Sequence, residues 1–350
     1  MIKPDKISKY TQSKLMSRYE KLSQDLTKMI IKKLKENGDI TEFNKAQIKT
    51  ISRIGGKEVF NATLKEIRGL NSKQKRDLIQ LFNELTKDEY KGYKSQFEDK
   101  NIDYKVSQSQ IQLVNTAINR TNKTLKNITK SVAFENKKAF TQSLDDLYFK
   151  VTSGGYAYDK AFKETVNDLS SKGVVLESKG KTYSLENVVK MNLNTALTQT
   201  ANEISKGIGK QIGANGVRIF HSSKCRPTHE PIDDVYMSLK EFEKYEYLTY
   251  EPNCCHVVNY IYDERFEDKA TFYPEDRLSA AEINRLYAIM QKQNYYARQV
   301  REKKDTIASG DTSAKAKSQL RNAQLKYRSY CKENNLEVDY SKTWKAGYNK

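Results

Sequence analysis

Residues 106–149 lie in the longest stretch of the chain without proline or glycine. Apolar side chains recur through these 44 residues at approximately heptad spacing, the pattern of an amphipathic helix. They are Ile111, Val114, Ile118, Leu125, Ile128, Val132, Phe140, Leu144 and Leu147. Because nothing in the segment ends a helix, we predict one continuous helix. Two interpretations stay open: an arm through which two chains self-associate, or one long helix of an ordinary bundle.

Helical spacing also dominates most of the remaining chain. A further helix is predicted from about Leu15 to a cap at Asn37-Gly38, and a short one from after Gly154-Gly155 to about Ser171. Others are predicted over 185–207, 279–307 and 313–333. We expect Ile54-Gly55-Gly56 to break the helical segment that resumes over 57–86. A small hairpin is predicted at 174–183, and short strands at 217–220 and 257–262. The predicted fold class is mainly α, with long helices or a helical bundle and a small, compact α+β module.

The charge of +18 is distributed unevenly and suggests three regions. Residues 1–150 are predicted to be an elongated basic helical region, 151–275 an α+β module with an acidic zone, and 276–350 a basic helical tail. Residues 221–276 carry six basic and thirteen acidic side chains, whereas 277–350 carry sixteen and seven. The excess of positive charge favours a polyanionic partner, but the acidic zone is not expected to lie against phosphates.

All three histidines and three of the four cysteines fall within 36 residues. The candidate metal ligands are His221, Cys225, His229, Cys254, Cys255 and His256. Thiolates and neutral imidazoles suit a structural zinc, and four of the six would suffice for a tetrahedral site. One alternative is a polar core without metal.

A second alternative is a metal-dependent nuclease or toxin-like enzyme that uses His229 and His256. No paired-carboxylate pattern or nuclease motif accompanies these residues, and Asp233-Asp234 suits a turn as well as a metal pair.

The first residues contain no apolar core of a signal peptide, and no window approaches the length of a membrane span. Four cysteines are too few for a disulfide framework in 350 residues. We therefore expect synthesis in a reducing cytoplasm.

Three motifs stand out between 221 and 256: the run from His221 through Arg226-Pro227-Thr228-His229, the stretch that starts at Val235-Tyr236, and Asn253-Cys254-Cys255-His256. With these motifs, residues 150–265 resemble phage minor capsid protein 2. A glycine-flanked lead-in over 173–183 is also similar, whereas Cys255 stands where the family has arginine.

The resemblance implies a structural protein of a tailed double-stranded DNA phage, without enzymatic activity. It implies a place in the virion, inside the head or at the portal vertex, after assembly in the host cytoplasm and with no membrane in the assembled head. Portal and capsid proteins would be its partners.

The basic tail is the predicted contact with duplex DNA. Its lysines and arginines would pair with phosphates without sequence preference, so binding should weaken steeply with salt. The candidate residues are Arg298, Arg301, Lys303, Lys304, Lys315, Lys317, Arg321, Lys326 and Arg328.

Overall fold

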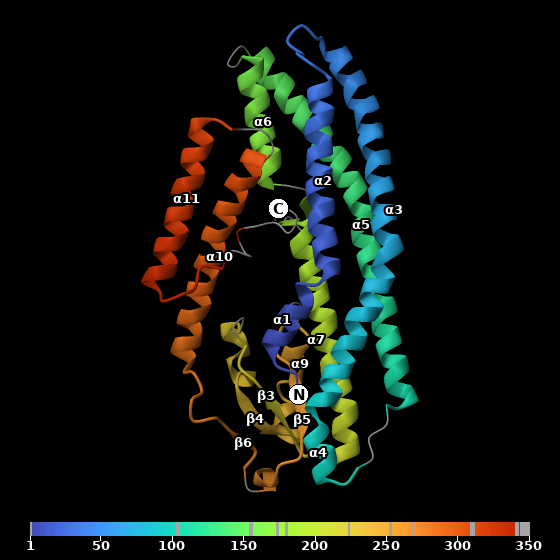
Figure 1. Cartoon of the computed structure of the whole chain (residues 1–350), viewed down its shortest axis with the longest axis vertical. Coiled ribbons are helices and arrows are strands. Elements are labelled where there is room, and N and C mark those ends of the chain that lie inside the picture. The colour runs from blue at the N-terminus through green and yellow to red at the C-terminus, as the bar shows by residue number, and fades with distance from the viewer. Residues whose placement is uncertain are drawn as a thin grey trace. The chain divides into compact units, whose positions relative to one another are not determined.

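The computed structural model describes residues 2–102, 106–153, 157–172, 175–178, 181–222, 225–251, 254–267, 269–308, 312–339 and 343. Its fold is mainly α with a small antiparallel sheet, which confirms the predicted fold class (Figure 1). The helices are α1 (Pro4–Thr11), α2 (Lys14–Glu36), α3 (Lys45–Gly92), α4 (Lys94–Asp99), α5 (Gln108–Thr152), α6 (Tyr158–Lys172), α7 (Leu185–Ile212), α8 (Leu239–Phe242), α9 (Glu246–Thr249), α10 (Ala280–Ala308) and α11 (Ala314–Glu333). Two 3-10 helices are η1 (Pro227–Ile232) and η2 (Glu264–Glu267).

Helix α5 confirms the long helix predicted over 106–149. Most of its predicted stripe is buried within the chain, including Leu125, Phe140 and Leu144, whereas Ile111 is 43% exposed. An apolar stripe that is already buried favours the interpretation as one helix of a bundle. Self-association through α5 stays a prediction.

Helix α3 corrects the break expected at Ile54-Gly55-Gly56, because it continues through both glycines. A Cβ atom on Gly55 would lie 2.7 Å from Cζ of Phe140 on α5. These glycines therefore allow two helices to approach closely, and their small size rather than their flexibility explains their place in the sequence.

The strands form two antiparallel sheets. Strands β1 (Val175–Ser178) and β2 (Lys181–Ser184) pair as the predicted hairpin. The larger sheet has the order β5-β3-β4-β6, with β3 (Gly216–Ile219), β4 (Val235–Ser238), β5 (Val258–Ile261) and β6 (Thr271–Phe272). The prediction of strands at 217–220 and 257–262 is confirmed, and β4 and β6 are two strands that it did not include.

The described chain forms two compact units made of interleaved segments. The first contains 1–16, 73–125 and 189–290, and the second contains 17–72, 126–188 and 291–350. An apolar cluster that includes Val217, Ile219 and Val258 lies in the first unit. The second unit contains a cluster around Phe140 and Leu144. The division of the sequence into three regions stays a prediction.

Helices α10 and α11 lie side by side, in orange and red in Figure 1. Beyond Gln291, their contact buries Ala297, Val300, Tyr327 and Cys331. The Ser313 hydroxyl caps α11 by accepting a hydrogen bond from the amide of Ala316. Residues 309–311, between the helices predicted over 279–307 and 313–333, lie outside the described residues, as do Gly154 and Gly155. Among the described residues, no helix combines the length and hydrophobicity needed to cross a bilayer.

Candidate metal centre

The larger sheet explains why residues separated in sequence meet at one site. Strands β3 and β5 are antiparallel, and Ile219 pairs with Val258. The chain leaving β3 and the chain entering β5 therefore lie at the same end of the sheet. His221 follows Ile219 by two residues and His256 precedes Val258 by two residues, so both fall beside the paired ends.

Three of the predicted ligands, His229, Cys254 and His256, converge. Their candidate ligand atoms all lie within 4.8 Å of one another. Sγ of Cys254 is 3.6 Å from Nδ1 of His229 and 3.5 Å from Nδ1 of His256. All three side chains are buried.

A carboxylate holds the far nitrogen of each of these imidazoles. Nε2 of His256 lies 2.8 Å from Asp233, and Nε2 of His229 lies 2.9 Å from Glu251. An ionised carboxylate only accepts hydrogen bonds, so Nε2 carries the hydrogen in both rings. When such a ring is neutral, Nδ1 carries the lone pair and faces Cys254, which is the arrangement found for histidines that bind zinc.

The distances suit a tetrahedral zinc. With about 2.3 Å to sulfur and about 2.0 Å to nitrogen, tetrahedral coordination places these two ligand atoms about 3.5 Å apart. The two observed sulfur–nitrogen distances, 3.6 and 3.5 Å, match that spacing. The separation between Cys254 and each imidazole is therefore that of neighbouring zinc ligands.

Electrostatics around the cluster agree with this protonation pattern. Burial alone would raise the pKa of Asp233, but hydrogen bonds from His221 and His256 hold it well below its usual range. The hydrogen bond with His229 lowers the pKa of Glu251. Burial raises the pKa of the Cys254 thiol to about 12, so the thiol keeps its proton in the absence of metal. Because zinc binds the thiolate, metal binding would release this proton.

The remaining predicted ligands differ in their placement. Cys225 forms a second group with Asp233 and His256. His221 places Nδ1 2.7 Å from Asp233, and this hydrogen bond raises the pKa of His221. Cys255 is buried but belongs to neither group among the described residues. Zinc binding by any four of the six stays a prediction, and Asn253 of the motif lies outside the described residues.

Asp233 and Glu251 are partners of the histidines that were not among the predicted ligands, although Asp233-Asp234 was considered as a metal pair. The two residues of the Asp233-Asp234 pair have different contacts. Asp233 is buried against two histidines, whereas Asp234 has φ of 50° and forms an ion pair with Arg218. Arg226 anchors Glu251 through a contact of 2.9 Å. The general rule that a metal-binding histidine needs a carboxylate or carbonyl partner could have directed attention to these acids.

The predicted DNA contacts lie on the two C-terminal helices. Arg298, Arg301, Lys303 and Lys304 belong to α10, and Lys315, Lys317, Arg321, Lys326 and Arg328 belong to α11. All five on α11 are exposed. On α10, Arg298 pairs with Glu302, and Nζ of Lys304 donates a hydrogen bond to Thr343.

The family model of phage minor capsid protein 2 matches residues 2–332, and the chain belongs to this family. Membership confirms the resemblance seen in the sequence and extends it over both units. It supports a structural, non-enzymatic role in a phage capsid, a place in the virion, and other phage head proteins as partners. No curated protein and no solved structure matches the chain significantly.

Proposed function

We propose that this minor capsid protein lies inside the head or at the portal vertex and contacts packaged duplex DNA through α11. The observation that supports the DNA contact is a row of exposed cations on this helix. Lys317, Arg321, Arg328 and Lys332 follow one another at spacings of four, seven and four, which places them on one side of an α-helix. The Cys331 side of α11 packs toward α10, so the row remains open.

The cations of this row are available for phosphates. Among the described residues, none of the four forms an ion pair with a carboxylate. A phosphate contact would therefore not have to displace an internal salt bridge. Binding of this kind depends on charge alone and gives no sequence preference.

The acidic segment 221–276 suits a different partner. With thirteen acidic and six basic side chains, it would be repelled by DNA. We propose that it faces a protein of the head, with the portal as the expected partner. The metal centre would stabilise the loops that present this segment.

The nuclease alternative has less support. His229 and His256 are each 1% exposed, so a phosphodiester could not reach them without movement of the surrounding loops. The burial of these rings is typical of a structural site rather than a catalytic one.

The test is the salt dependence of binding to a duplex oligonucleotide. Wild-type affinity should fall steeply between about 50 and 200 mM salt. Replacing Lys317, Arg321 and Arg328 by glutamine should reduce the magnitude of the log–log slope by about 2.7, since each phosphate contact contributes about 0.9. The matched control replaces Lys65, Lys73 and Lys87 of α3, which removes the same charge from another helix. Affinity that is flat with salt, or equal slopes for the two variants, would refute the DNA contact.

The portal contact is tested separately by co-sedimentation with DNA-free proheads and with isolated portal. Binding to both, weakened by charge reversal of Glu241 and Glu243 in the acidic segment, is expected. Retention by proheads without portal, with no binding to isolated portal, would contradict the proposed partner.

A further inference from the structure

A groove of about 800 Å³ lies between α10 and α11, on a different side of α11 from the row Lys317, Arg321, Arg328 and Lys332. Its lining combines tyrosines and lysines from both helices. The residues are Lys292, Tyr295 and Tyr296 of α10, and Leu325, Lys326, Ser329, Tyr330, Glu333 and Asn334 of α11. All belong to the second unit. Of the lysines and tyrosines that line the groove, only Lys326 was among the DNA contacts predicted from the sequence. The other four are Lys292, Tyr295, Tyr296 and Tyr330.

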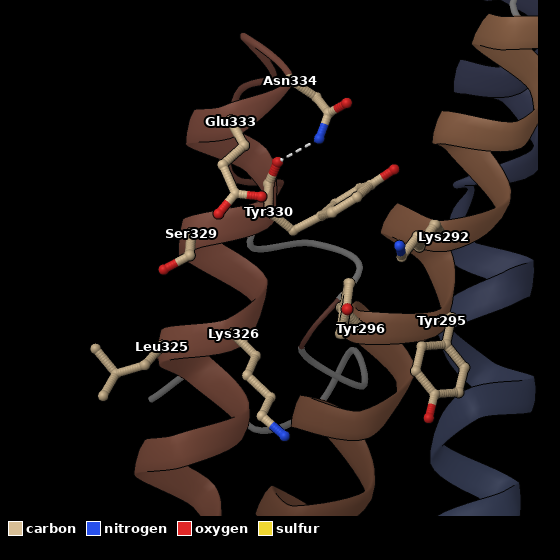
Figure 2. Close-up of a pocket in the computed structure, with 9 residues that line it drawn as sticks. All are labelled: Lys292, Tyr295, Tyr296, Leu325, Lys326, Ser329, Tyr330, Glu333 and Asn334. Carbon is tan, nitrogen blue, oxygen red and sulfur yellow. Dashed lines mark hydrogen bonds between the residues drawn. The ribbon is translucent and has the colours of Figure 1, made fainter.

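The aromatic side chains form a connected surface across the two helices. Figure 2 shows the ring of Tyr330 reaching from α11 toward α10. The rings of Tyr296 and Tyr330 are 5.2 Å apart at their centres, and those of Tyr295 and Tyr296 are 5.4 Å apart. Tyr295 is 49% exposed, so a flat ligand can reach this surface.

Two cations accompany the rings. The ammonium of Lys292 lies 5.5 Å from the centre of the Tyr330 ring, and Lys326 extends from α11 toward α10 (Figure 2). Both lysines are exposed, and among the described residues neither forms a salt bridge. Glu333 is the one acidic residue of the lining and belongs to the last turn of α11.

We propose that this groove binds single-stranded DNA, with bases stacked on Tyr295 and Tyr296 and phosphates paired with Lys292 and Lys326. Exposed aromatic rings beside lysines are the combination that binds unpaired strands, because rings stack on bases and ammonium groups neutralise the backbone. In a duplex the bases already stack on one another, so a tyrosine surface offers little to it. Helical periodicity also places Lys303 on the same side of α10 as Lys292 and Tyr296, which would continue the cationic path along the groove.

This inference rests on the proposed contact with DNA. Helices α10 and α11 form a helical hairpin, and we assign duplex DNA to the side that carries the cationic row and single-stranded DNA to the side that carries the groove. Two kinds of variant separate the sides. Tyr295→Ala removes an exposed ring that is not part of the α10–α11 core, and Lys292→Gln with Lys326→Gln removes the two cations. Their controls are Tyr247→Ala, which removes a ring 66% exposed outside the hairpin, and Lys65→Gln with Lys73→Gln on α3.

The experiment measures fluorescence anisotropy of a labelled oligothymidine of about 12 nucleotides and of a duplex, each over a range of salt. Tyr295→Ala should weaken oligothymidine binding about five- to tenfold and leave duplex binding unchanged. The double lysine variant should reduce the magnitude of the salt slope for oligothymidine by about 1.4, since each phosphate contributes about 0.7 for single strands. The controls should retain wild-type affinity for oligothymidine within about twofold.

Duplex binding that persists while oligothymidine fails to bind, or is unaffected by Tyr295→Ala, would overturn the groove and leave the proposed function standing. Loss of duplex affinity equal to the loss of oligothymidine affinity in Tyr295→Ala would also overturn it. Failure of the wild-type protein to bind either form of DNA would refute both proposals. Circular dichroism of each variant verifies that the helices remain folded.

Discussion

The His/Cys cluster and the α10–α11 hairpin differ in the burial and pairing of their polar side chains. In the cluster, His229, His256 and Asp233 are buried; His256 is hydrogen-bonded to Asp233, and His229 to Glu251. On the hairpin, lysines and arginines are exposed, and several form no salt bridge among the described residues. Buried polar groups affect stability because removing one leaves its partners unsatisfied, whereas exposed cations affect binding with little influence on folding. The contrast leads us to expect that substitutions in the cluster change the folded state, and that those on the hairpin change what the protein binds.

The largest expected effect comes from the centre of the cluster. Purified protein should contain about one zinc per chain by mass spectrometry, and His256→Ala should lose it together with about 3–5 kcal/mol of stability. Thermal unfolding with and without chelator measures the second quantity. Wild-type protein that contains no zinc and is unaffected by chelator would make the cluster a polar core without metal.

The buried carboxylate of Glu89, outside the cluster, tests whether buried polar groups elsewhere in the chain also affect stability. Burial raises the pKa of Glu89 to about 7, and this carboxylate accepts a hydrogen bond from the amide of Ile2, with Lys6 nearby. The folded state then binds more protons than the unfolded state between about pH 4.5 and 7, so Glu89 makes stability fall as pH rises through this window.

Glu89→Gln should remove that dependence and raise stability at pH 8 by about 3 kcal/mol, because no charge is then buried and the neutral amide keeps an acceptor for Ile2. Denaturant unfolding at pH 5.5 and pH 8 measures it. If the free energy of unfolding changes with pH in the same way for wild type and variant, ionisation of Glu89 does not destabilise the folded protein.

An intermediate effect is expected from the carboxylate that positions a ligand. Glu251→Gln keeps the size of the side chain but weakens the hold on Nε2 of His229, so zinc affinity should fall about 10- to 100-fold. Competition with a metal-binding dye gives the affinity. Glu241→Gln, in the same acidic segment but bonded to Lys244, is the matched control and should bind zinc as the wild type does.

The smallest effect should come from the hairpin. Replacing both Lys292 and Lys326 by glutamine should change the free energy of unfolding by less than about 0.5 kcal/mol, since these side chains are exposed and form no salt bridge among the described residues. A larger loss of stability would break the contrast and give the groove a structural role.

The sequence predicted elements whose signal is local. The helix α5 followed from apolar spacing, and β3 and β5 followed from short apolar runs between turns. The continuity of α3 could not be predicted, because the reason for Gly55 is Phe140, a residue 85 positions away. A glycine that ends a helix and a glycine that admits a neighbouring ring have the same local pattern.

The candidate site was predicted as a set of residue types rather than as a geometry. Clustering of histidine and cysteine identified the zone, and pairing of β3 with β5 decides which of them meet. Asp233 and Glu251 could not be selected from thirteen acidic residues of the segment by composition alone. The aromatic groove was missed for a related reason, because its two halves lie on separate helices and only the packing of α10 on α11 joins them.

The interleaving of the two units has a consequence for how the chain can be divided. Helices α3, α5 and α7 each contribute residues to both units without interruption. No single cut in the backbone separates one unit from the other, so a protease acting on the folded protein should leave fragments that stay associated until denatured. Melting that starts in one unit would fray helices that continue into the other.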